Sequence, residues 1–465
     1  MQRSRTRIAQ GALVVALVAS LVSPSAHATG GFDVAAENAR TGTPHWQVTS
    51  KEFTKQTLAF VDRTSVLPGE SFGLYVSCHG SGFTMRALRV GDYAGLGARA
   101  VWTSPTQPCV VQRAPRVDTA TNEATAPWKR SLDITTNEWP EGMYVLKVKS
   151  DDGSATYVDL VLRSRETAGR VVLVSSTQTF EAYNQWGGAN AYRGTKGFST
   201  RARVVSYDRP NTWGAGSGKF IGYEAPLVRR AEALGLPLAY LADTDITANP
   251  AILDGATSIV FGGHAEYWTQ YERDAVMRAR DNGTNLLFFG ANTAYWRVRL
   301  ASSDLGARRV MDIYKSRSSD PNKTKPSIRF RDTGQPDSGL TVVTYNCFPA
   351  RGTFTVTEPL SWVFQGADVH KGQTFAGIIG PEIDKMSDKV PGTAVLAYSP
   401  ATCGKHATHS TMVLSHAASG AATFAVGTMG WVPKVLQGEA PAESVQLAKT
   451  ITDNVLRAST VRGLA

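Results

Sequence analysis

Hydrophobic and polar residues alternate in two different ways along this chain. Between about residue 61 and residue 162, short runs rich in β-branched and aromatic residues are separated by turns such as Pro68-Gly69 and Asp152-Gly153. The clearest runs are 71–77 (SFGLYVS), 143–148 (MYVLKV) and 155–162 (ATYVDLVL). Because no strong amphipathic helix interrupts them, the pattern predicts an Ig-like β-sandwich over residues 61–165, preceded by an N-terminal arm over 29–60.

From residue 170 to residue 458 the pattern changes to apolar runs that alternate with helical periodicity. The apolar runs are typical of strands buried on both faces of a sheet, and they span 170–174, 238–241, 258–261, 285–289 and 422–428. Helices are predicted over 225–235, 269–282 and 442–456, the second burying a face with Tyr271, Ala275 and Ala279. This alternation predicts an α/β domain with a covered parallel sheet, and residues 301–420 are interpreted as a strand-and-loop insertion.

The first 28 residues have the three parts of a secretory signal peptide. Basic residues from Arg3 to Arg7 precede an apolar stretch over 12–22, and Ala26-His27-Ala28 offers a cleavage site. A retained membrane anchor is the alternative, but the apolar stretch is short for one. No later apolar run approaches the ~20 residues of a membrane helix, so we expect a secreted protein with no membrane span after cleavage.

Composition and charge exclude two further classes. The chain of 465 residues is 42% hydrophobic and 19% charged, which is not the composition of a disordered protein. Removing Arg3, Arg5 and Arg7 with the leader lowers the formal net charge from +10 to +7. The basic residues are scattered over the chain, so we expect no nucleic-acid partner.

Four cysteines follow the leader, and an even number in an exported protein favours disulfides. Three pairings are possible. We favour Cys78–Cys109 with Cys347–Cys403, because each bridge then stays within one region of the chain. The alternative is a metal site built from Cys403, His406 and His409, although their loop offers no second nearby cysteine.

Polar and aromatic residues follow three of the predicted parallel strands. Tyr183 and Tyr192 come after the first of these strands, His264 and Glu266 come after the third, and Asn292 comes after the fourth. In open α/β sheets, ligands bind beyond the carboxyl ends of the strands. Adjacent glycines, such as Gly262-Gly263, would let the backbone approach a ligand closely.

These segments resemble the large-subunit domain of N,N-dimethylformamidase. The resemblance rests on motifs over residues 182–188 (AYNQWGG), 207–210 (YDRP), 263–268 (GHAEYW), 289–297 (FGANTAYWR), 380–384 (GPEID) and 427–431 (GTMGW), within a match from about residue 170 to 458. It implies a fold related to class I glutamine amidotransferases, with a β-sandwich-like companion. It also implies a mononuclear iron held by two tyrosines and one glutamate, which fall here on Tyr183, Tyr192 and Glu266, with Tyr207 as the competing second tyrosine.

The implied activity is hydrolysis of a C–N amide bond by a metal-activated water. Phenolate and carboxylate oxygens are hard ligands that suit Fe(III). His264 would shuttle a proton to the leaving amine, and Asn292 would orient the carbonyl or a ligand. The partners would be a small amide substrate and either a small second subunit or further copies of the chain. Hydrolysis of another amide, such as one in a cell envelope or polysaccharide, is a variant of this hypothesis.

Other schemes fit the sequence less well. The G-x-S-x-G match at residues 69–73 runs into a predicted strand, whereas a nucleophile elbow needs a strand, a turn and a helix. The place of a glutamine amidotransferase cysteine holds Gly262-Gly263-His264 instead. The glycine-rich loop 214–218 follows no apolar strand and is a weak phosphate site. The main alternative function is a non-catalytic extracellular binding module that keeps the fold and its aromatic cleft.

Overall fold

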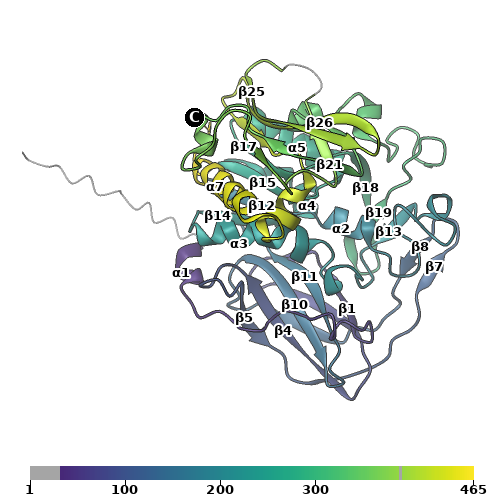
Figure 1. Ribbon diagram of the computed structural model, residues 1–465. Helices are drawn as coiled ribbons and strands as arrows, with labels where there is room; N and C mark the ends of the chain where they lie inside the picture. Colours follow the sequence, from purple (N-terminus) through teal and green to yellow (C-terminus); the bar gives the residue numbers. More distant parts are fainter. Residues whose placement is uncertain (1–31, 387–389, 465) are drawn as a thin grey trace, which may run out of the picture. The chain divides into compact units, whose positions relative to one another are not determined.

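The computed structural model describes residues 32–386 and 390–464, so the predicted signal peptide lies outside the described residues. The fold of these two ranges is mixed α/β, with many short strands and few helices (Figure 1). None of the helices in these ranges combines the length and apolar composition that crossing a membrane would require.

The N-terminal third contains two sheets around one hydrophobic cluster. Leu74 of one sheet packs in this cluster with Met85 and Leu146 of the other. The predicted runs 71–77, 143–148 and 155–162 are strands of these sheets, which confirms them as strands. The first sheet has the order β1 (Leu58–Val61), β3 (Ser71–Ser77), β9 (Leu132–Thr135); the second has the order β2 (Ser65–Val66), β11 (Ala155–Leu162), β10 (Gly142–Ser150), β4 (Gly82–Val90), β5 (Ala98–Thr103), with β6 (Gln107–Pro108) pairing β4.

The described part of the predicted N-terminal arm is packed against the rest of the chain. It contains helix α1 (Val34–Asn38) and the start of β1. Glu37 of α1 is buried, accepts a 2.8 Å hydrogen bond from the Tyr93 hydroxyl and pairs with Arg99. These partners lie more than fifty residues away in sequence, so no local pattern could indicate them.

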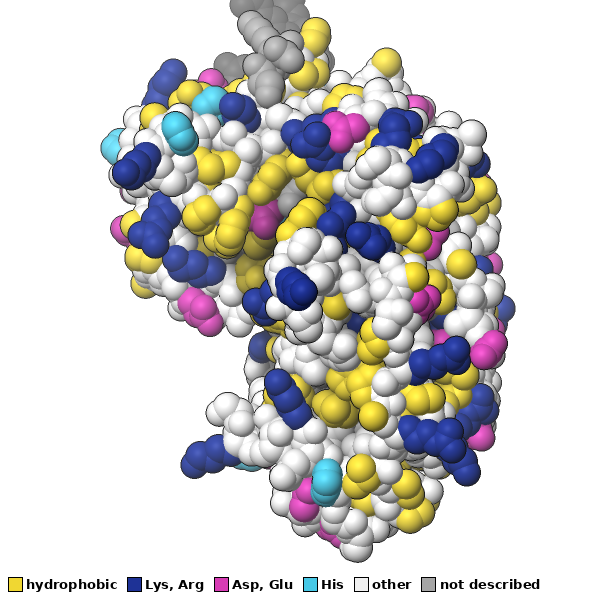
Figure 2. Space-filling model, turned by 90° about the vertical axis from the view of Figure 1, so that its right-hand side faces the viewer, with side chains coloured by type: hydrophobic (Ala, Val, Ile, Leu, Met, Phe, Trp, Pro, Cys, Tyr) yellow, Lys and Arg dark blue, Asp and Glu magenta, His cyan; other side chains and the backbone are white. Residues whose placement is uncertain are grey.

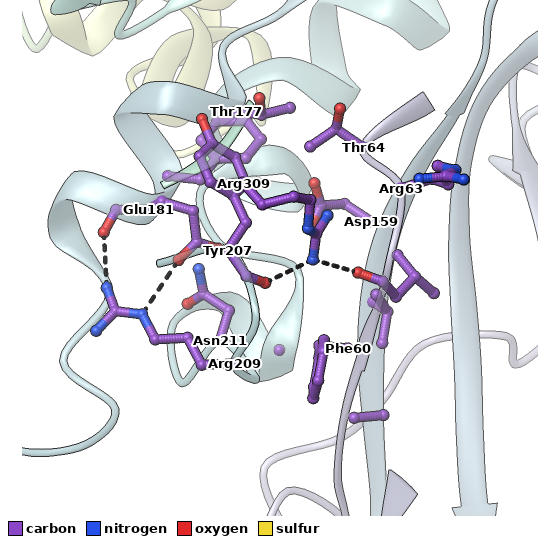
Figure 3. Close-up of a pocket in the computed structure, with 15 residues that line it drawn as sticks. Phe60, Arg63, Thr64, Asp159, Thr177, Glu181, Tyr207, Arg209, Asn211 and Arg309 are labelled. Carbon is purple, nitrogen blue, oxygen red and sulfur yellow. Dashed lines mark hydrogen bonds and ion pairs between the residues drawn. The ribbon is translucent and has the colours of Figure 1, made fainter. Parts of the chain in front are cut away.

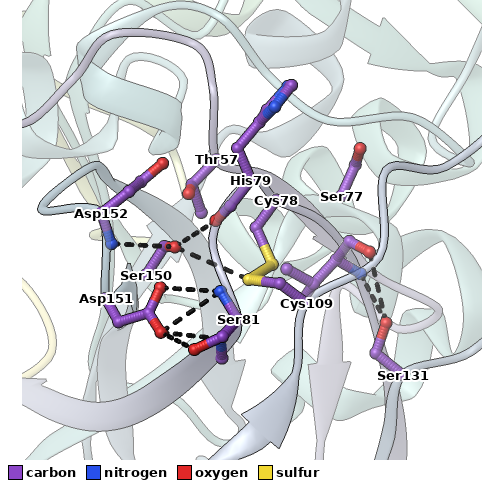
Figure 4. Close-up of a disulfide and its surroundings, with 12 residues drawn as sticks. Thr57, Ser77, Cys78, His79, Ser81, Cys109, Ser131, Ser150, Asp151 and Asp152 are labelled. Carbon is purple, nitrogen blue, oxygen red and sulfur yellow. Dashed lines mark hydrogen bonds between the residues drawn. A yellow bond between two sulfur atoms is a disulfide. The ribbon is translucent and has the colours of Figure 1, made fainter.

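Both predicted disulfides are present. Cys78, directly after β3, is joined to Cys109 after β6 (Figure 4). Cys347 of β20 (Thr344–Cys347) is joined to Cys403 at the end of β25 (Thr393–Cys403). Because the Cys403 thiol is in a disulfide, the alternative metal site with His406 and His409 is wrong.

The central sheet has eight strands, and its first five are parallel. All five predicted parallel strands are confirmed, in the order β14 (Leu238–Ala242), β12 (Val171–Ser175), β15 (Ser258–Gly263), β17 (Asn285–Gly290), β27 (Ala422–Ala425). The sheet then continues with three antiparallel strands, β26 (His406–His416), β25 and β21 (Ala350–Gly352). Part of the segment 301–420, interpreted above as an insertion, is therefore the continuation of the sheet itself.

Helices cover both faces of the parallel strands. Helices α4 (Asp243–Ala248) and α5 (Gln270–Asp281) pack in one hydrophobic cluster with alternate strand residues such as Val172 and Phe261. Helices α3 (Ala225–Ala233) and α7 (Ala442–Ala458) contact each other on the opposite face (Figure 1). The predicted face of α5 needs one correction: Tyr271 is 61% exposed, because the buried face also takes Glu272, Arg273 and Val276.

A smaller sheet and a short helix lie at the carboxyl ends of the parallel strands. The helix is α2 (Thr177–Tyr183), which follows β12 directly. The sheet has the order β13 (Val204–Ser206), β19 (Gly306–Asp312), β18 (Trp296–Ser303), β16 (Tyr267–Thr269). β16 pairs β18 in parallel and thereby sets Tyr267 opposite Trp296.

The remaining α-helix and strands are short. They are α6 (Ser338–Thr341) and three two-stranded sheets, β20 with β24 (Ile383–Lys385), β22 (Phe354–Thr355) with β23 (Thr374–Phe375), and β7 (Arg116–Asp118) with β8 (Glu123–Thr125).

A buried ion pair joins the N-terminal sheets to the central sheet region. Arg89 of β4 and Glu232 of α3 have fully buried side chains, and Arg89 Nη2 lies 2.7 Å from Glu232 Oε1. From Asp33 onward, the described residues form one compact unit.

Candidate active site

Three segments bring the candidate residues to the carboxyl ends of the parallel strands. Tyr183 is the last residue of α2, and Tyr192 follows in the next loop. His264 and Glu266 come directly after β15, where Gly263 has a φ of 49°. A Cβ at Gly263 would lie 2.4 Å from the Tyr223 carbonyl oxygen, so this sharp turn requires glycine.

The two tyrosine hydroxyls meet on the two oxygens of one carboxylate. Tyr183 donates a 2.7 Å hydrogen bond to Glu266 Oε2, and Tyr192 donates to Glu266 Oε1. His264 Nε2 lies 3.2 Å from Glu266 Oε2 and 3.1 Å from the Tyr183 hydroxyl. Glu266 is 1% exposed and His264 2%. The structure thus brings together four of the five predicted site residues.

The backbone around the two tyrosines is held by the side chain of Asn190. Its Nδ2 donates to the Tyr183 carbonyl at 3.1 Å, and its Oδ1 accepts from the Tyr192 amide at 2.9 Å. Asn190 is 5% exposed. A single amide side chain therefore fixes the spacing of the two phenols, because it hydrogen-bonds both of their residues.

Arg209, from the YDRP motif, hydrogen-bonds the backbone of the segment that carries Tyr183. Its guanidinium is fully buried and donates to the carbonyls of Trp186 and Glu181 at 3.2 Å. The arginine thereby ties the last turn of α2 to the loop that follows it.

Burial and charge shift the pKa values of the two tyrosines and of Glu266 in opposite directions. Burial, and next the charge of Glu266, raise the pKa values of Tyr183 and Tyr192 well above their ordinary value. Burial alone would raise the pKa of Glu266, but the hydrogen bond and charge of His264, with Lys315 and Tyr192, lower it. In the protein alone, therefore, an ionised carboxylate accepts hydrogen bonds from two neutral phenols.

Two lysines that the sequence analysis did not single out lie against the tyrosine rings. Lys219 Nζ is 4.2 Å from the centre of the Tyr183 ring, and Lys315 Nζ is 3.4 Å from that of Tyr192. Lys315 also donates a 2.7 Å hydrogen bond to the Tyr267 hydroxyl. Burial lowers the pKa of Lys219 to about 8 and that of Lys315 to about 7, against the opposing charge of Glu266.

Asn292, the fifth predicted residue, contacts two other acids instead of Glu266. Its Nδ2 donates to Glu382 Oε2 at 2.8 Å, and its backbone amide donates to Asp384 at 2.9 Å. Its Oδ1 is buried and has no hydrogen-bond partner in the described residues. Burial raises the pKa of Glu382, whereas His264 lowers it and Glu266 raises it further, so the two acids and the histidine share one electrostatic environment.

Tyr207, the competing second tyrosine, lines a different cavity. This cavity of about 40 Å³ is bordered by Phe60, Asp159, Arg209 and Arg309 (Figure 3). Among the described residues the Tyr207 hydroxyl has no hydrogen-bond partner, so it does not bind the Glu266 carboxylate.

The donor set fits a hard cation better than a soft one. Within residues 32–386 and 390–464, no group of three or more His, Cys, Asp or Glu side chains is arranged to hold a metal ion. The cluster of Tyr183, Tyr192 and Glu266 offers phenol and carboxylate oxygens instead. Such all-oxygen anionic sets match hard, highly charged ions.

The face of the molecule that carries β13, β18 and β19 is hollowed. Figure 2 shows hydrophobic side chains lining the hollow, an acidic side chain inside it and Lys and Arg side chains on its rim. Directly before β18, Tyr295 packs against Trp296 and Tyr345 at ring distances of 5.2 and 5.1 Å.

Sequence reasoning missed Lys219, Lys315 and the contact of Glu382 with Asn292. Lys219 follows a glycine-rich loop, and Lys315 lies in the segment interpreted as an insertion. Neither has a periodic or motif signal around it, because its partners lie far away in the sequence. For Glu382, the GPEID motif was visible but its partner was not.

Comparison with known families gives one match that covers most of the chain. A family model described as "N,N-dimethylformamidase beta subunit-like, C-terminal" matches residues 84–441. The match begins within β4, so it extends further toward the N-terminus than the resemblance from about residue 170 had indicated.

The other comparisons add no argument about function. No curated protein matches this chain. Among solved structures, the cycloisomaltooligosaccharide glucanotransferase of Paenibacillus sp., complexed with cycloisomaltoheptaose, aligns with a TM-score of 0.18 and 8% identity. The alignment covers 64% of this chain and 61% of that one, so the chain spans less than two thirds of its length.

Proposed function

Because this chain belongs to the N,N-dimethylformamidase beta subunit-like family, we propose that it is a metal-dependent amidohydrolase that cleaves a C–N amide bond. One observation carries the proposal: two phenol hydroxyls converge on the two oxygens of the buried Glu266 carboxylate. Among the described residues, no Arg or Lys nitrogen lies within 4.0 Å of that carboxylate. A buried carboxylate normally needs a cationic partner, so this cluster is suited to bind a cation.

Tyr183, Tyr192 and Glu266 would hold the metal, which we propose to be mononuclear Fe(III). When bound, such an ion polarises an amide carbonyl and makes a water acidic enough to act as nucleophile near neutral pH. Loading requires both phenols to lose their protons, so metal binding releases protons to solvent.

The remaining residues would handle the substrate and the proton. His264 Nε2 lies beside both Glu266 and Tyr183, where it can carry a proton to the leaving nitrogen. Asn292 is held by Glu382 and Asp384, so its free Oδ1 has a fixed direction. We assign Asn292 the role of orienting the substrate amide.

We also propose a specific fold for each region of the chain and a location for the protein. The five parallel strands would be a class I glutamine amidotransferase-like domain over 170–458, and the two N-terminal sheets an Ig-like sandwich over 61–165. Two disulfides fit an oxidising compartment, which supports export of the chain. A small second subunit or further copies of this chain would complete the assembly.

Iron loading of the purified mature chain tests the proposal. The wild-type protein should bind about one Fe(III) per chain and show a tyrosinate-to-iron charge-transfer band. Tyr183→Phe should lose both, whereas Tyr207→Phe, whose hydroxyl has no partner among the described residues, should keep both. Hydrolysis of small amides, followed by amine release, should depend on the iron.

A colourless protein that binds no metal after reconstitution would contradict the proposal. That result would favour the alternative, a non-catalytic extracellular binding module. Equal loss of the band in Tyr183→Phe and Tyr207→Phe would instead contradict the choice of ligands.

A further inference from the structure

A strongly basic segment borders the candidate active site. Residues 315–331 (KSRSSDPNKTKPSIRFR) contain six lysines and arginines and one acid, Asp320. Asp320 is buried and is bound by Arg299 at 2.9 Å, so it does not offset the charge that the segment presents to solvent. Arg317, Lys323 and Lys325 are exposed.

The basic segment forms a pocket with two aromatic residues. This pocket of about 360 Å³ is lined by Tyr295, Trp296, Lys315 and Arg317, among others. Its size is sufficient for a small organic molecule. Lys315 lies in the pocket wall, 4.7 Å from the Trp296 ring, and also contacts the Tyr192 ring at 3.4 Å. The pocket therefore adjoins the tyrosine–glutamate cluster.

Two of the pocket's basic side chains are not paired with carboxylates. Arg329 forms a bidentate pair with Asp332, at 2.7 and 3.0 Å. In contrast, Arg317 has no carboxylate within 4.0 Å among the described residues, and Lys315 donates to a phenol. An anionic group of a ligand would find complementary charge here, which a neutral amide would leave unused.

Asn292 gives an independent indication of the ligand. Because its Nδ2 is bound to Glu382, its buried Oδ1 is left as an acceptor without a donor in the described residues. A buried acceptor without a partner costs free energy, which an amide N–H of the substrate would recover. N,N-dialkyl amides have no N–H, whereas secondary amides have one.

From these two observations we infer that the preferred substrate is a secondary amide that carries a carboxylate, that is, an N-acyl amino acid. Its carboxylate would lie at Arg317 and its N–H would donate to Asn292. Hydrolysis would add the OH of water to the acyl carbon, break the C–N bond and deliver a proton to the nitrogen, so that a carboxylic acid and an amino acid leave. This inference rests on the proposed function, but it makes its own prediction about binding.

Calorimetric titration of the iron-loaded mature chain with three small ligands tests the inference. N-acetylglycine should bind about tenfold more tightly than its neutral amide, N-acetylglycinamide, because it keeps the charged contact. It should also bind about tenfold more tightly than N-acetylsarcosine, which keeps the carboxylate but has no amide N–H. Arg317→Gln should abolish the first preference and leave the second.

Arg165→Gln is the matched control. Arg165 is exposed, lies between β11 and β12, and has no ion-pair partner in the described residues, so its replacement should change neither preference. Equal binding of N-acetylglycine and N-acetylglycinamide, or a preference that survives in Arg317→Gln, would overturn the inference. Turnover measured in parallel separates the two proposals: preferential binding without hydrolysis contradicts the amidohydrolase, and hydrolysis without preference contradicts only the substrate class.

Discussion

Glu232 and Glu266 are both buried beside tyrosines, yet their charges are met in different ways. Glu232, where the N-terminal sheets meet the central region, receives both ends of the Arg89 guanidinium at 2.7 and 3.0 Å, together with the Tyr240 hydroxyl. Glu266, at the carboxyl ends of the parallel strands, receives two tyrosine hydroxyls and faces His264. The first carboxylate is paired with a permanently charged guanidinium, whereas the second is hydrogen-bonded by phenols and lies beside a histidine.

This difference distinguishes a structural ion pair from a candidate binding site. A carboxylate paired with a guanidinium has little affinity left for another cation, because its charge and its lone pairs are used. A carboxylate that is bound by two phenols and faces a histidine can exchange the phenol protons for a metal ion.

Breaking the Arg89–Glu232 ion pair should have the largest effect on stability. Arg89→Met leaves the Glu232 carboxylate buried without its cation, and we expect a loss of about 3–5 kcal/mol in the free energy of unfolding. Denaturant unfolding followed by fluorescence measures this. The double variant Arg89→Met/Glu232→Met should recover part of the loss. A free energy of unfolding of Arg89→Met within about 1 kcal/mol of wild type would show that the pair does not stabilise the fold.

Neutralising the candidate ligand should affect iron binding and leave folding nearly unchanged. Glu266→Gln should reduce bound Fe(III) by about 100-fold in affinity, because one anionic ligand is lost. The metal-free variant should unfold within about 1 kcal/mol of wild type, because no Arg or Lys of the described residues lies within 4.0 Å of this carboxylate and the neutral amide avoids the cost of a buried charge. Glu232→Gln should show the reverse pattern, with unstable but iron-competent protein. Iron retained at wild-type affinity in Glu266→Gln would rule out this carboxylate as a ligand.

Removing the side chain that spaces the two tyrosines should have an intermediate effect. Asn190→Ala loses the contacts to the Tyr183 carbonyl and the Tyr192 amide, so we expect about tenfold weaker iron binding and a shifted charge-transfer band. Asn190→Asp keeps the acceptor for Tyr192 and should lie between Ala and wild type. An unchanged band in Asn190→Ala would show that the tyrosines are held by other contacts.

Asp159, whose carboxylate has neither an arginine nor a tyrosine hydroxyl as partner within the described part of the chain, should show the smallest effect. Burial, and next the charge of Glu181, raise the pKa of Asp159 to about 7, whereas an unfolded chain has about 3.9. The folded protein therefore binds the extra proton between about pH 4 and pH 7. This contribution to stability is complete below about pH 4 and is lost as the pH rises through about 7.

Asp159→Asn should remove this pH dependence. Relative to wild type, the variant should gain on the order of 1 kcal/mol between pH 4 and pH 8, less than the full pKa shift implies because the Asp159 side chain is partly exposed; unfolding at both pH values measures this gain. Asp304→Asn, at an exposed acid in the turn between β18 and β19, is the matched control and should show no such gain. A gain equal in both variants would assign the effect to net charge.

Much of the scaffold could be predicted because its signals are local. Continuous apolar runs gave the five parallel strands, and the separation of the four cysteines into two regions gave both disulfide pairings. The pattern failed where partners are distant: α1 packs through Glu37 against Tyr93, and β25 extends the central sheet by pairing with β26, although β25 alternates in burial along much of its length.

The sequence by itself determined that a β-rich N-terminal region precedes a parallel sheet, and that aromatic and acidic residues follow the ends of its strands. Only the tertiary structure decided that Tyr192 and not Tyr207 lies on Glu266, that Lys219 and Lys315 flank the phenols, and that Glu232 has an arginine. The physical reason is that strand and helix formation depend on neighbours in sequence. The charge balance of a buried carboxylate depends instead on side chains tens to hundreds of residues away, which meet only when the chain is folded.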